Sequence, residues 1–420
     1  MSSDQPYFPQ IQDITKAKLG LNEVILHTPL QKNLDLSEEF KANVLLKRED
    51  LQVVRSYKLR GAYNKISNLS PKELKKGIVC ASAGNHAQGV AYSCRKLGIF
   101  GKIYMPATTP KQKIRQVNMF GKDNVEIDLL GDTYDDSYKL ALEYCQKNGM
   151  VFIHPFDDRE IIEGQATMGI EILQDTKKQV DYLFIPIGGG GLAAGVGAYF
   201  KQVSPHTKII GVEPAGAPSM KASLEAGKVI TLNSIDKFVD GAAVQRVGDL
   251  TFDICRQVVD QVIPVPEGKI CTKILELYNR DAIVLEPAGA LSIAALDFFK
   301  DEIKGKNVVC IVSGSNNDIT RTEEIKERSL LYEGLKHYFI VRFPQRAGAL
   351  RTFVDIVLGP NDDITHFEYS KKTNREKGPA VIGIEVQRKE DFQGLIQRLE
   401  ENGFIYEYLN EKPGLFQFLI

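Results

Sequence analysis

The sequence lacks any apolar stretch approaching the roughly 20 residues that a membrane-spanning helix needs. Its start, Met1–Pro6, is polar and does not show the charged and then apolar order of a signal peptide. The formal net charge is only -1, and no Lys/Arg-rich run is interleaved with aromatic residues. Composition therefore gives no basis for binding nucleic acid or an anionic membrane, and we expect a cytoplasmic protein.

Cysteine is also scarce, with six residues among 420. No Cys-x-x-Cys pair occurs and no cysteine has metal-like spacing with histidine, so we predict no metal site. Because most of these cysteines lie inside apolar or helical runs, we expect reduced residues of the core. They are Cys80, Cys94, Cys145, Cys255, Cys271 and Cys310.

What is present is typical of a large globular protein of two or three domains, with 43% hydrophobic and 25% charged residues. From Gly77 onward, short apolar strands alternate with amphipathic helices. This order favours an α/β fold with parallel sheets covered by helices on both faces. We expect strands over 42–47, 78–82, 102–105, 125–129, 151–153, 182–187, 209–213 and 308–312, and helices over 11–18, 59–69, 85–97, 111–120, 159–174 and 192–202, with Asp132 as the N-cap of a further helix.

The C-terminal part follows a different pattern. Apolar and polar residues alternate over 338–343, as in a half-buried strand. A helix over 349–357, strands over 364–370 and 380–386, a helix over 391–401 and a strand over 404–409 complete a β-α-β-β-α-β order, which is ferredoxin-like. We therefore predict a large α/β domain (1–51 and 156–334, including a charged linker helix over 322–336), a small α/β domain (52–155) and an α+β domain (335–420).

One lysine, Lys58, lies between two arginines in the stretch Arg55–Ala62. A lysine amine forms Schiff bases with carbonyl compounds when it is held neutral. Because a neighbouring cation disfavours the ammonium form, we expect Arg55 and Arg60 to lower the pKa of Lys58. The alternative, a solvated helix lysine, is disfavoured by the motifs that the rest of the chain supplies.

A run of glycines separates the expected strand over 182–187 from the helix that follows. It consists of Gly188, Gly189, Gly190 and Gly191, followed by Leu192. Successive glycines let backbone N–H groups converge on one centre, and the helix N-terminus adds positive potential. The loop lacks the Lys-Ser/Thr of a nucleotide P-loop and the spacing of a dinucleotide fingerprint, so it predicts a site for a single phosphate. A flexible tight turn is the alternative.

Two polar loops follow other strands, and ligands of open α/β sheets bind at such strand ends. In Ser82–Gly89, the Ser82 hydroxyl and backbone N–H groups suit a carboxylate, and the Asn85 amide suits a ring hydroxyl. For His86 in the same loop, a structural or capping role is the alternative to a direct role in catalysis. In Val312–Asn316, Ser313 is either a plain N-cap or a partner for a heterocyclic nitrogen.

A reactive lysine, a phosphate cradle and a polar partner for a ring together describe a pyridoxal-phosphate site. The chain resembles the fold-type II pyridoxal-phosphate enzymes, and among them closely the biosynthetic threonine dehydratases. The resemblance covers nearly the whole chain. Its motifs, in order, are Ser56–Ala62, Ser82–Gly89, Thr109–Lys111, Gly188–Leu192, Glu286–Ala290 and Ser313–Asn316.

The resemblance implies roles for individual residues. Lys58 would carry pyridoxal 5'-phosphate, Asn85 would contact the ring hydroxyl and Ser313 would face the pyridine nitrogen. Gly188–Leu192 would hold the phosphate. A neutral hydroxyl cannot keep the ring nitrogen strongly protonated, which favours β-elimination over transamination. The expected substrate contacts are Ser82, Gly84, Asn85 and His86.

The implied reaction is the conversion of L-threonine to 2-oxobutanoate and ammonia, on the route to isoleucine. The C-terminal domain resembles an ACT-like regulatory domain, which implies isoleucine and valine as effectors and a homo-oligomer, a dimer or tetramer. A ligand-free oligomerisation module is its alternative.

Other readings remain open, namely a serine dehydratase or racemase of the same fold type, or a non-catalytic amino-acid sensor. Ala83 stands where racemases carry a serine, which counts against racemisation. A loop from Glu213 resembles a cation site of some relatives, but one carboxylate does not commit it to a metal.

Overall fold

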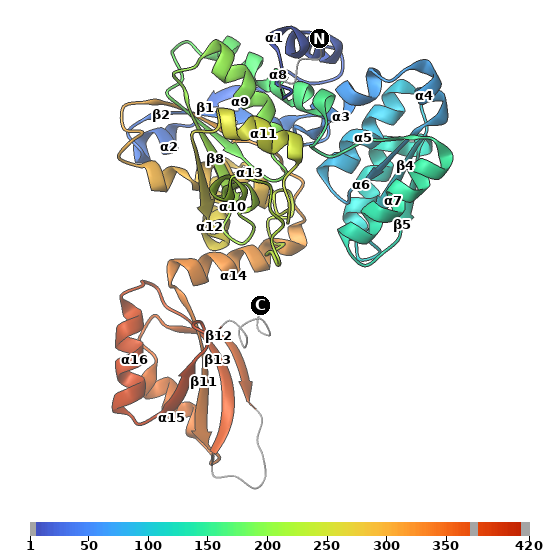
Figure 1. Ribbon diagram of the computed structural model, residues 1–420. Coiled ribbons are helices and arrows are strands. Elements are labelled where there is room, and N and C mark those ends of the chain that lie inside the picture. The colour runs from blue at the N-terminus through green and yellow to red at the C-terminus, as the bar shows by residue number, and fades with distance from the viewer. Residues whose placement is uncertain (1–5, 370–376, 413–420) are drawn as a thin grey trace. The chain divides into compact units, whose positions relative to one another are not determined.

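A computed structural model describes residues 6–369 and 377–412 of the chain (Figure 1). The chain divides into two compact units, Met1–Asp318 and Ile319–Ile420, and each is described by itself. No helix among the described residues combines the length and apolar content of a membrane span. The proposed subdivision of the first unit into a large and a small domain, and the boundary at residue 335, stay predictions.

The larger sheet of the first unit has six strands in the order β1-β2-β10-β7-β8-β9. Only the edge strand β1 is antiparallel. The strands are β1 (Leu30–Lys32), β2 (Asn43–Arg48), β7 (Tyr182–Pro186), β8 (Lys208–Pro214), β9 (Gln261–Val265) and β10 (Asn307–Val312). Every residue of β7 is buried, as expected for a parallel strand covered on both faces.

Helices cover both faces of this sheet. Val309 and Ile311 of β10 join a core cluster with α8, α9 and α11, whereas the intervening Cys310 contacts Ser292 of α13. Since successive strand residues point to opposite faces, these two sets of helices lie on opposite sides. The helices of this part are α1 (Ile11–Leu21), α2 (Leu34–Glu39), α8 (Arg159–Asp175), α9 (Gly191–Val203), α10 (Ser219–Ala226), α11 (Asp249–Val258), α12 (Glu267–Asp281) and α13 (Pro287–Ala294).

The smaller sheet is fully parallel, in the order β5-β4-β3-β6. Its strands are β3 (Ile78–Ala81), β4 (Gly101–Met105), β5 (Val125–Leu129) and β6 (Val151–Phe152). The accompanying helices are α3 (Lys58–Ser67), α4 (Pro71–Lys76), α5 (Asn85–Leu97), α6 (Lys111–Gly121) and α7 (Tyr134–Asn148). The expected alternation of strands and helices is confirmed, and the six cysteines are free and buried, as predicted.

The predicted N-cap of α7 is wrong by one residue. The side chain of Thr133, not Asp132, accepts a hydrogen bond from the N–H of Asp136, at 3.2 Å. The Asp136 carboxylate in turn accepts the N–H of Thr133, at 3.0 Å. Thr133 and Asp136 form a capping box, in which each side chain accepts the backbone N–H of the other residue. Spacing alone did not reveal this, because Asp132 also has an aspartate, Asp135, three positions later.

The second unit confirms the predicted β-α-β-β-α-β order. Its strands form an antiparallel sheet in the order β12-β13-β11-β14. The elements are α14 (Thr322–Glu333), β11 (Lys336–Pro344), α15 (Ala349–Val357), β12 (Asp363–Tyr369), β13 (Lys377–Glu385), α16 (Asp391–Glu401) and β14 (Ile405–Tyr408). The polar segment 371–377 between the two expected strands is predicted to be a loop, and it lies outside the described residues except for Lys377. Glu327 of α14 accepts hydrogen bonds from Lys336 and from the Tyr338 hydroxyl, which attaches the charged helix to this sheet.

A buried cluster of charges joins α3 to the larger sheet. The Arg60 guanidinium donates to Glu49 at 2.7 and 2.8 Å, and to Glu171 of α8 at 2.8 and 2.9 Å. Lys47 of β2 and Lys18 of α1 also bind Glu171, at 2.7 and 2.6 Å. These partners hold the pKa of Glu171 well below its usual range. Five charged side chains from residues 18–171 of the unit thus form one cluster.

We expect Arg60→Met to lower the free energy of unfolding by about 3–5 kcal/mol, because two buried carboxylates lose a shared partner. Urea unfolding followed by circular dichroism would measure this loss. Arg256→Ala is the matched control, because it breaks an exposed pair with Asp253 and should cost less than about 1 kcal/mol. Equal losses in the two variants would contradict the structural role of the buried cluster.

Candidate functional site

Lys58 is the first residue of α3 and reaches the end of the smaller sheet. Its amine lies 3.4 Å from the carbonyl oxygen of Pro155 and 5.4 Å from the centre of the Tyr57 ring. Burial lowers the pKa of the Lys58 amine to about 8, and the carboxyl of Glu286 opposes this shift. A substantial fraction of the amine is therefore neutral near physiological pH, as a Schiff-base lysine requires.

The lowered pKa was predicted, but the predicted cause was wrong. The charge of Arg60 is compensated by Glu49 and Glu171 in the buried cluster. Arg55 is exposed, with a positive φ of 58°, and contributes its backbone carbonyl to the N–H of Ser315. Desolvation, not the two arginines, accounts for the shift of Lys58.

The loop after β10 is joined to the segment before Lys58 by the backbone. Ser56 pairs with Gly314 in an isolated bridge, and the N–H of Tyr57 donates to the carbonyl of Ser313 at 3.2 Å. The Ser313 side chain is buried, and its hydroxyl donates to the carbonyl of Ala288 at 3.2 Å. Lys58 and Ser313 are thus held in neighbouring segments. That Ser313 faces the pyridine nitrogen of the cofactor stays a prediction.

The glycine run bridges β7 and α9 and packs too closely for side chains. A Cβ at Gly189 would lie 2.3 Å from the Phe156 ring, and one at Gly190 would lie 2.8 Å from Met220 and Thr251. Gly190 also has a φ of +97°, which disfavours other residues. Phe156 follows Pro155, whose carbonyl contacts Lys58, so the chain brings the lysine and this loop together.

The N–H groups of the same loop are available to an anion. Within the part of the chain that the structure describes, residues 188–192 have no hydrogen-bond acceptor for their backbone N–H groups. They lie at the positive end of α9, where a phosphate is favoured. The side chain of Leu192 is buried in the core, so its contribution is its backbone. The arrangement fits the predicted single-phosphate cradle.

The loop before α5 places the Asn85 amide in a chain of hydrogen bonds. Asn85 Nδ2 donates to Glu286 Oε1 at 2.7 Å, and Asn85 Oδ1 accepts from Asn316 at 2.6 Å. The Ser82 hydroxyl accepts the N–H of Gly84 at 3.2 Å, which shapes the turn into the helix. Asn85 thereby connects the ends of β3 and β10, where ligands of parallel sheets bind.

His86 is buried and its Nε2 lies 3.0 Å from the carbonyl oxygen of Ile153. Burial and the nearby Lys58 lower the pKa of His86 to about 3, so the ring is neutral. The substrate contacts expected for Ser82, Gly84, Asn85 and His86 stay predictions. The contact of His86 with the carbonyl of Ile153 fits the structural role that was the alternative prediction for this residue.

The Glu213 carboxylate binds backbone N–H groups at the start of α10. Its two carboxylate oxygens accept the N–H groups of Met220 and Lys221 at the start of α10, at 2.7 and 2.9 Å. Among the described residues, no group of three or more His, Cys, Asp or Glu side chains could hold a metal ion. The carboxylate therefore serves as a helix cap here.

Glu286 is a site residue to which the sequence analysis gave no role. It precedes α13, is buried, and lies beside Asn85 and Lys58. Burial raises the pKa of Glu286 to about 7, and nearby Asp240 adds to this shift. The sequence signal was a glutamate placed directly before Pro287 in a motif that otherwise contains only small residues.

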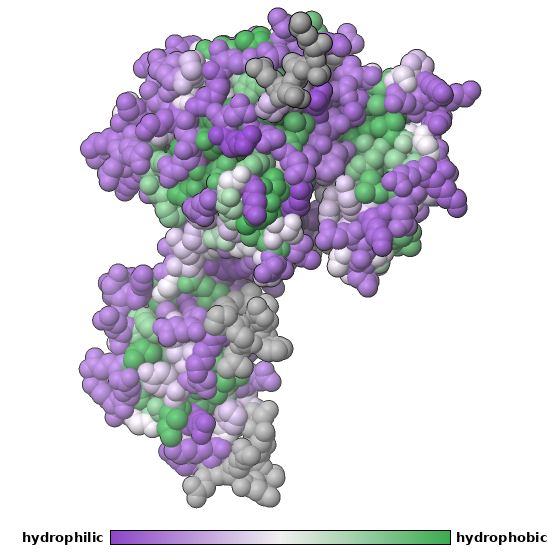
Figure 2. Space-filling model, in the orientation of Figure 1, coloured by the Kyte–Doolittle hydropathy of each residue, from purple (hydrophilic) through white to green (hydrophobic). Residues whose placement is uncertain are grey.

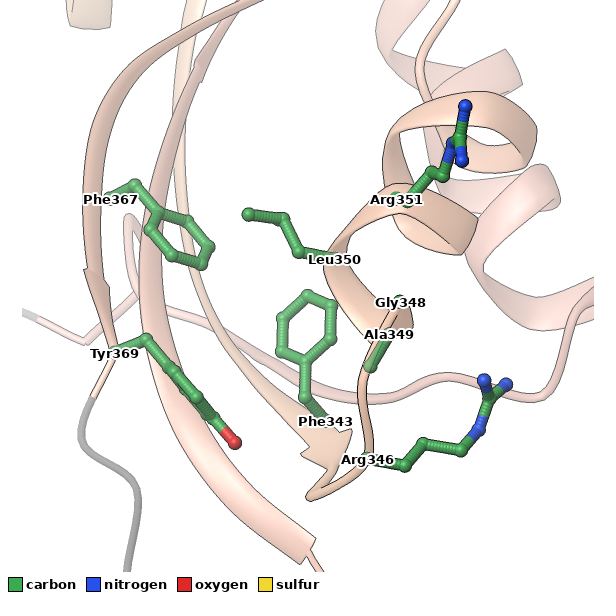
Figure 3. A pocket seen from close by; sticks show the side chains of 8 residues that line it. All are labelled: Phe343, Arg346, Gly348, Ala349, Leu350, Arg351, Phe367 and Tyr369. Atoms are coloured by element: carbon green, nitrogen blue, oxygen red, sulfur yellow. The ribbon is translucent and has the colours of Figure 1, made fainter.

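The second unit contains a cavity of its own, of about 320 Å³. Phe367 and Tyr369 of β12 form one wall and face Phe343 and Leu350 on the other (Figure 3). Gly348, with a φ of +81°, begins α15 at its edge. The guanidinium groups of Arg346 and Arg351 lie at the rim and extend away from the rings (Figure 3). This face of the sheet is apolar with positive charge beside it.

Comparison with known proteins identifies both parts of the chain. Residues 21–314 match the family described as pyridoxal-phosphate dependent enzyme, and residues 327–419 match the C-terminal regulatory domain of threonine dehydratase. The chain is 61% identical to the biosynthetic L-threonine dehydratase IlvA of Halalkalibacterium halodurans, over 98% of this chain and 99% of the relative. It is 60% identical to the protein of that name from Bacillus subtilis, over 98% of this chain and 97% of the relative.

Solved structures agree for the first unit. The processed form of threonine deaminase isoform 2 from Solanum lycopersicum has a TM-score of 0.72 and 42% identity, covering 77% of this chain and 96% of that one. Maize serine racemase also has a TM-score of 0.72, with 30% identity, covering 78% of this chain and 99% of that one. The fold is therefore shared by lyases and racemases, so the fold alone does not determine which reaction is catalysed.

We expect Gly190→Ala to weaken pyridoxal-phosphate binding by about 10- to 100-fold, because the new Cβ would overpack against Met220 and Thr251. Cofactor titration of the apoprotein, followed by absorbance, would measure the change. Gly227→Ala is the matched control, since Gly227 also has a positive φ, of +68°, but has open space around it. Similar cofactor affinities in the two variants would argue against the cradle.

Proposed function

The chain belongs to the pyridoxal-phosphate dependent enzymes and to the biosynthetic L-threonine dehydratases among them, and we propose that it converts L-threonine to 2-oxobutanoate and ammonia. The water lost from the β-carbon is regained when the nitrogen leaves as ammonia, so the reaction needs no oxidant or reductant. The observation that carries this proposal is the amine of Lys58, whose pKa burial lowers to about 8, in a chain that resembles these lyases over its full length.

The cofactor, when bound, supplies the carbonyl that links to Lys58 and the electron-withdrawing ring. The N–H groups of residues 188–192 would hold its phosphate, and the Asn85 amide and Ser313 hydroxyl would orient its ring. The amine of Lys58 would be the base that takes the proton from the substrate α-carbon. The first turn of α5 offers backbone N–H groups for the substrate carboxylate, beside Ser82 and Gly84.

The chemistry favours dehydration over racemisation. A racemase needs a second acid–base group on the opposite face, and Ala83 provides none. The neutral hydroxyl of Ser313 keeps the ring a moderate electron sink, so a β-hydroxyl can leave before the α-carbon is reprotonated. A sensor without catalysis is disfavoured, because Lys58, Asn85 and the glycine loop are all intact.

The C-terminal unit supports a regulatory proposal. Isoleucine binds it and inhibits, valine opposes isoleucine, and the protein works as a homo-oligomer in the cytoplasm. The cavity beside α15 suits such effectors, because Phe343, Leu350 and Phe367 would surround a branched apolar side chain. The effector carboxylate would face the N-terminus of α15 and the positive rim of the cavity.

The test of the reaction is 2-oxobutanoate release from L-threonine. Lys58→Ala should reduce kcat by at least about 10³-fold, since it removes both the cofactor link and the base. It should also abolish the absorbance of the lysine-linked cofactor. A Lys58→Ala variant that keeps both signals would refute the assignment, and release of pyruvate from L-serine alone would favour a serine dehydratase.

We expect Leu350→Ala to raise the isoleucine concentration for half-inhibition by about 10-fold, because the apolar wall of the cavity is lost. Val354→Ala is the matched control. Val354 lies on the same helix and has the same exposed fraction as Leu350, 41%, but does not line the cavity. Threonine turnover without isoleucine should be unchanged in both. Equal responses of the two variants to isoleucine would place the effector elsewhere.

A further inference from the structure

Glu286 is a buried glutamate that lies near three segments of the site: the start of α5 with Asn85, the loop after β10 with Gly314, and the start of α3 with Lys58. Its Oε1 atom accepts a hydrogen bond from Asn85 Nδ2 at 2.7 Å, and the side chain is 4% exposed. The backbone leaves space for this carboxylate, because a Cβ at Gly314 would lie 2.3 Å from the same oxygen. Residue 314 must therefore be a glycine to make room for the side chain of Glu286.

The hydrogen bonds around Asn85 have a fixed direction. Asn316 Nδ2 lies 2.9 Å from the carbonyl of Val54, which can only accept, so this atom must be a donor. The atom of Asn85 that faces it at 2.6 Å must then be the oxygen. The amide nitrogen of Asn85 consequently faces Glu286, which completes the chain as an acceptor. One hydrogen of that nitrogen is left for a ligand.

Among the charged groups near Lys58, the Glu286 carboxylate is the one that favours a proton on the lysine amine. Asp240 and Lys113 face Glu286 but pair with each other. His86 and His154 face Lys58, and burial lowers their pKa values to about 3 and about 4, so both are neutral above pH 5. With a raised pKa of about 7, Glu286 is neutral below that pH and negative where Lys58 titrates, near pH 8.

We propose that Glu286 is a positioning residue for the proposed reaction: it fixes the Asn85 amide as a donor toward the cofactor and supplies the negative charge that favours a proton on the nitrogen of Lys58. This inference rests on the proposed function for its cofactor, but it concerns residues of this chain alone. Neither effect requires threonine, so both are measured on the enzyme without substrate.

Two substitutions separate the charge from the reach of the side chain. Glu286→Gln keeps the length and removes the charge, so the pH midpoint at which the Lys58-linked cofactor absorbance changes should fall by about one unit. Glu286→Asp keeps the charge but is shorter by one methylene, so it should keep the midpoint and weaken pyridoxal-phosphate binding by about 10-fold. Asp240→Asn is the matched control and should leave cofactor affinity unchanged.

The outcomes decide each part of the proposal. An unchanged midpoint in Glu286→Gln would overturn the charge role, and wild-type affinity in Glu286→Asp would overturn the positioning role. If either variant fails to fold, Asn316→Ala provides the test, because it removes the second partner of the Asn85 amide and leaves Glu286 in place. It should keep the wild-type cofactor affinity and midpoint, and an affinity about 10-fold weaker would assign the positioning of Asn85 to Asn316 instead of Glu286. Because these readouts exclude substrate, failure of threonine turnover alone would refute the proposed function and not this inference.

Discussion

The guanidinium of Arg60, held between two buried carboxylates, is the interaction on which the first unit depends. Glu49 follows β2 of the larger sheet, Glu171 lies on α8, and Arg60 follows Lys58 by two residues on α3. A buried charge costs several kcal/mol unless it is paired, so none of these elements can slide without leaving one unpaired. The place of Lys58 is therefore determined by contacts that do not involve Lys58. Burial of the same helix start then lowers the pKa of the amine, so that fold and reactivity have one origin.

Close backbone approach is the second constraint on the site. A side chain at Gly190 would collide with Met220, and a side chain at Gly314 would collide with Glu286. Gly289 lies so close to the carbonyl of Gly314 that a Cβ at residue 289 would be 2.2 Å from the carbonyl oxygen. These glycines bring the ends of β3, β7 and β10 near enough for short polar side chains to reach across. Figure 2 shows apolar residues interspersed among polar ones on the visible surface of the first unit.

Much of the fold of the first unit was predictable from the sequence. Alternation of apolar strands and amphipathic helices located eight of the ten strands that the structure describes in the first unit. The two that were missed, β1 and β9, are the edge strands of the larger sheet. The glycine loop was found because positive φ and close packing exclude other residues. The environment of single charges was not predictable: Arg60 occurs in a polar stretch and nothing local shows that Glu49 and Glu171 will enclose it. Glu286 was given no role for the same reason, since its partner Asn85 is 201 positions away.

The topology of the larger sheet has a consequence for synthesis of the chain. Strand β2 pairs with β10, and Asn43 meets Asn307 across 264 positions, whereas the smaller sheet is made entirely from residues 78–152. On the ribosome, the smaller sheet can assemble as soon as its residues emerge, but β2 must wait for nearly the whole first unit. Until then its apolar strand has no partner on one side. Such long-range pairing is slow to form, so the nascent chain spends this interval exposed to aggregation and in need of chaperones.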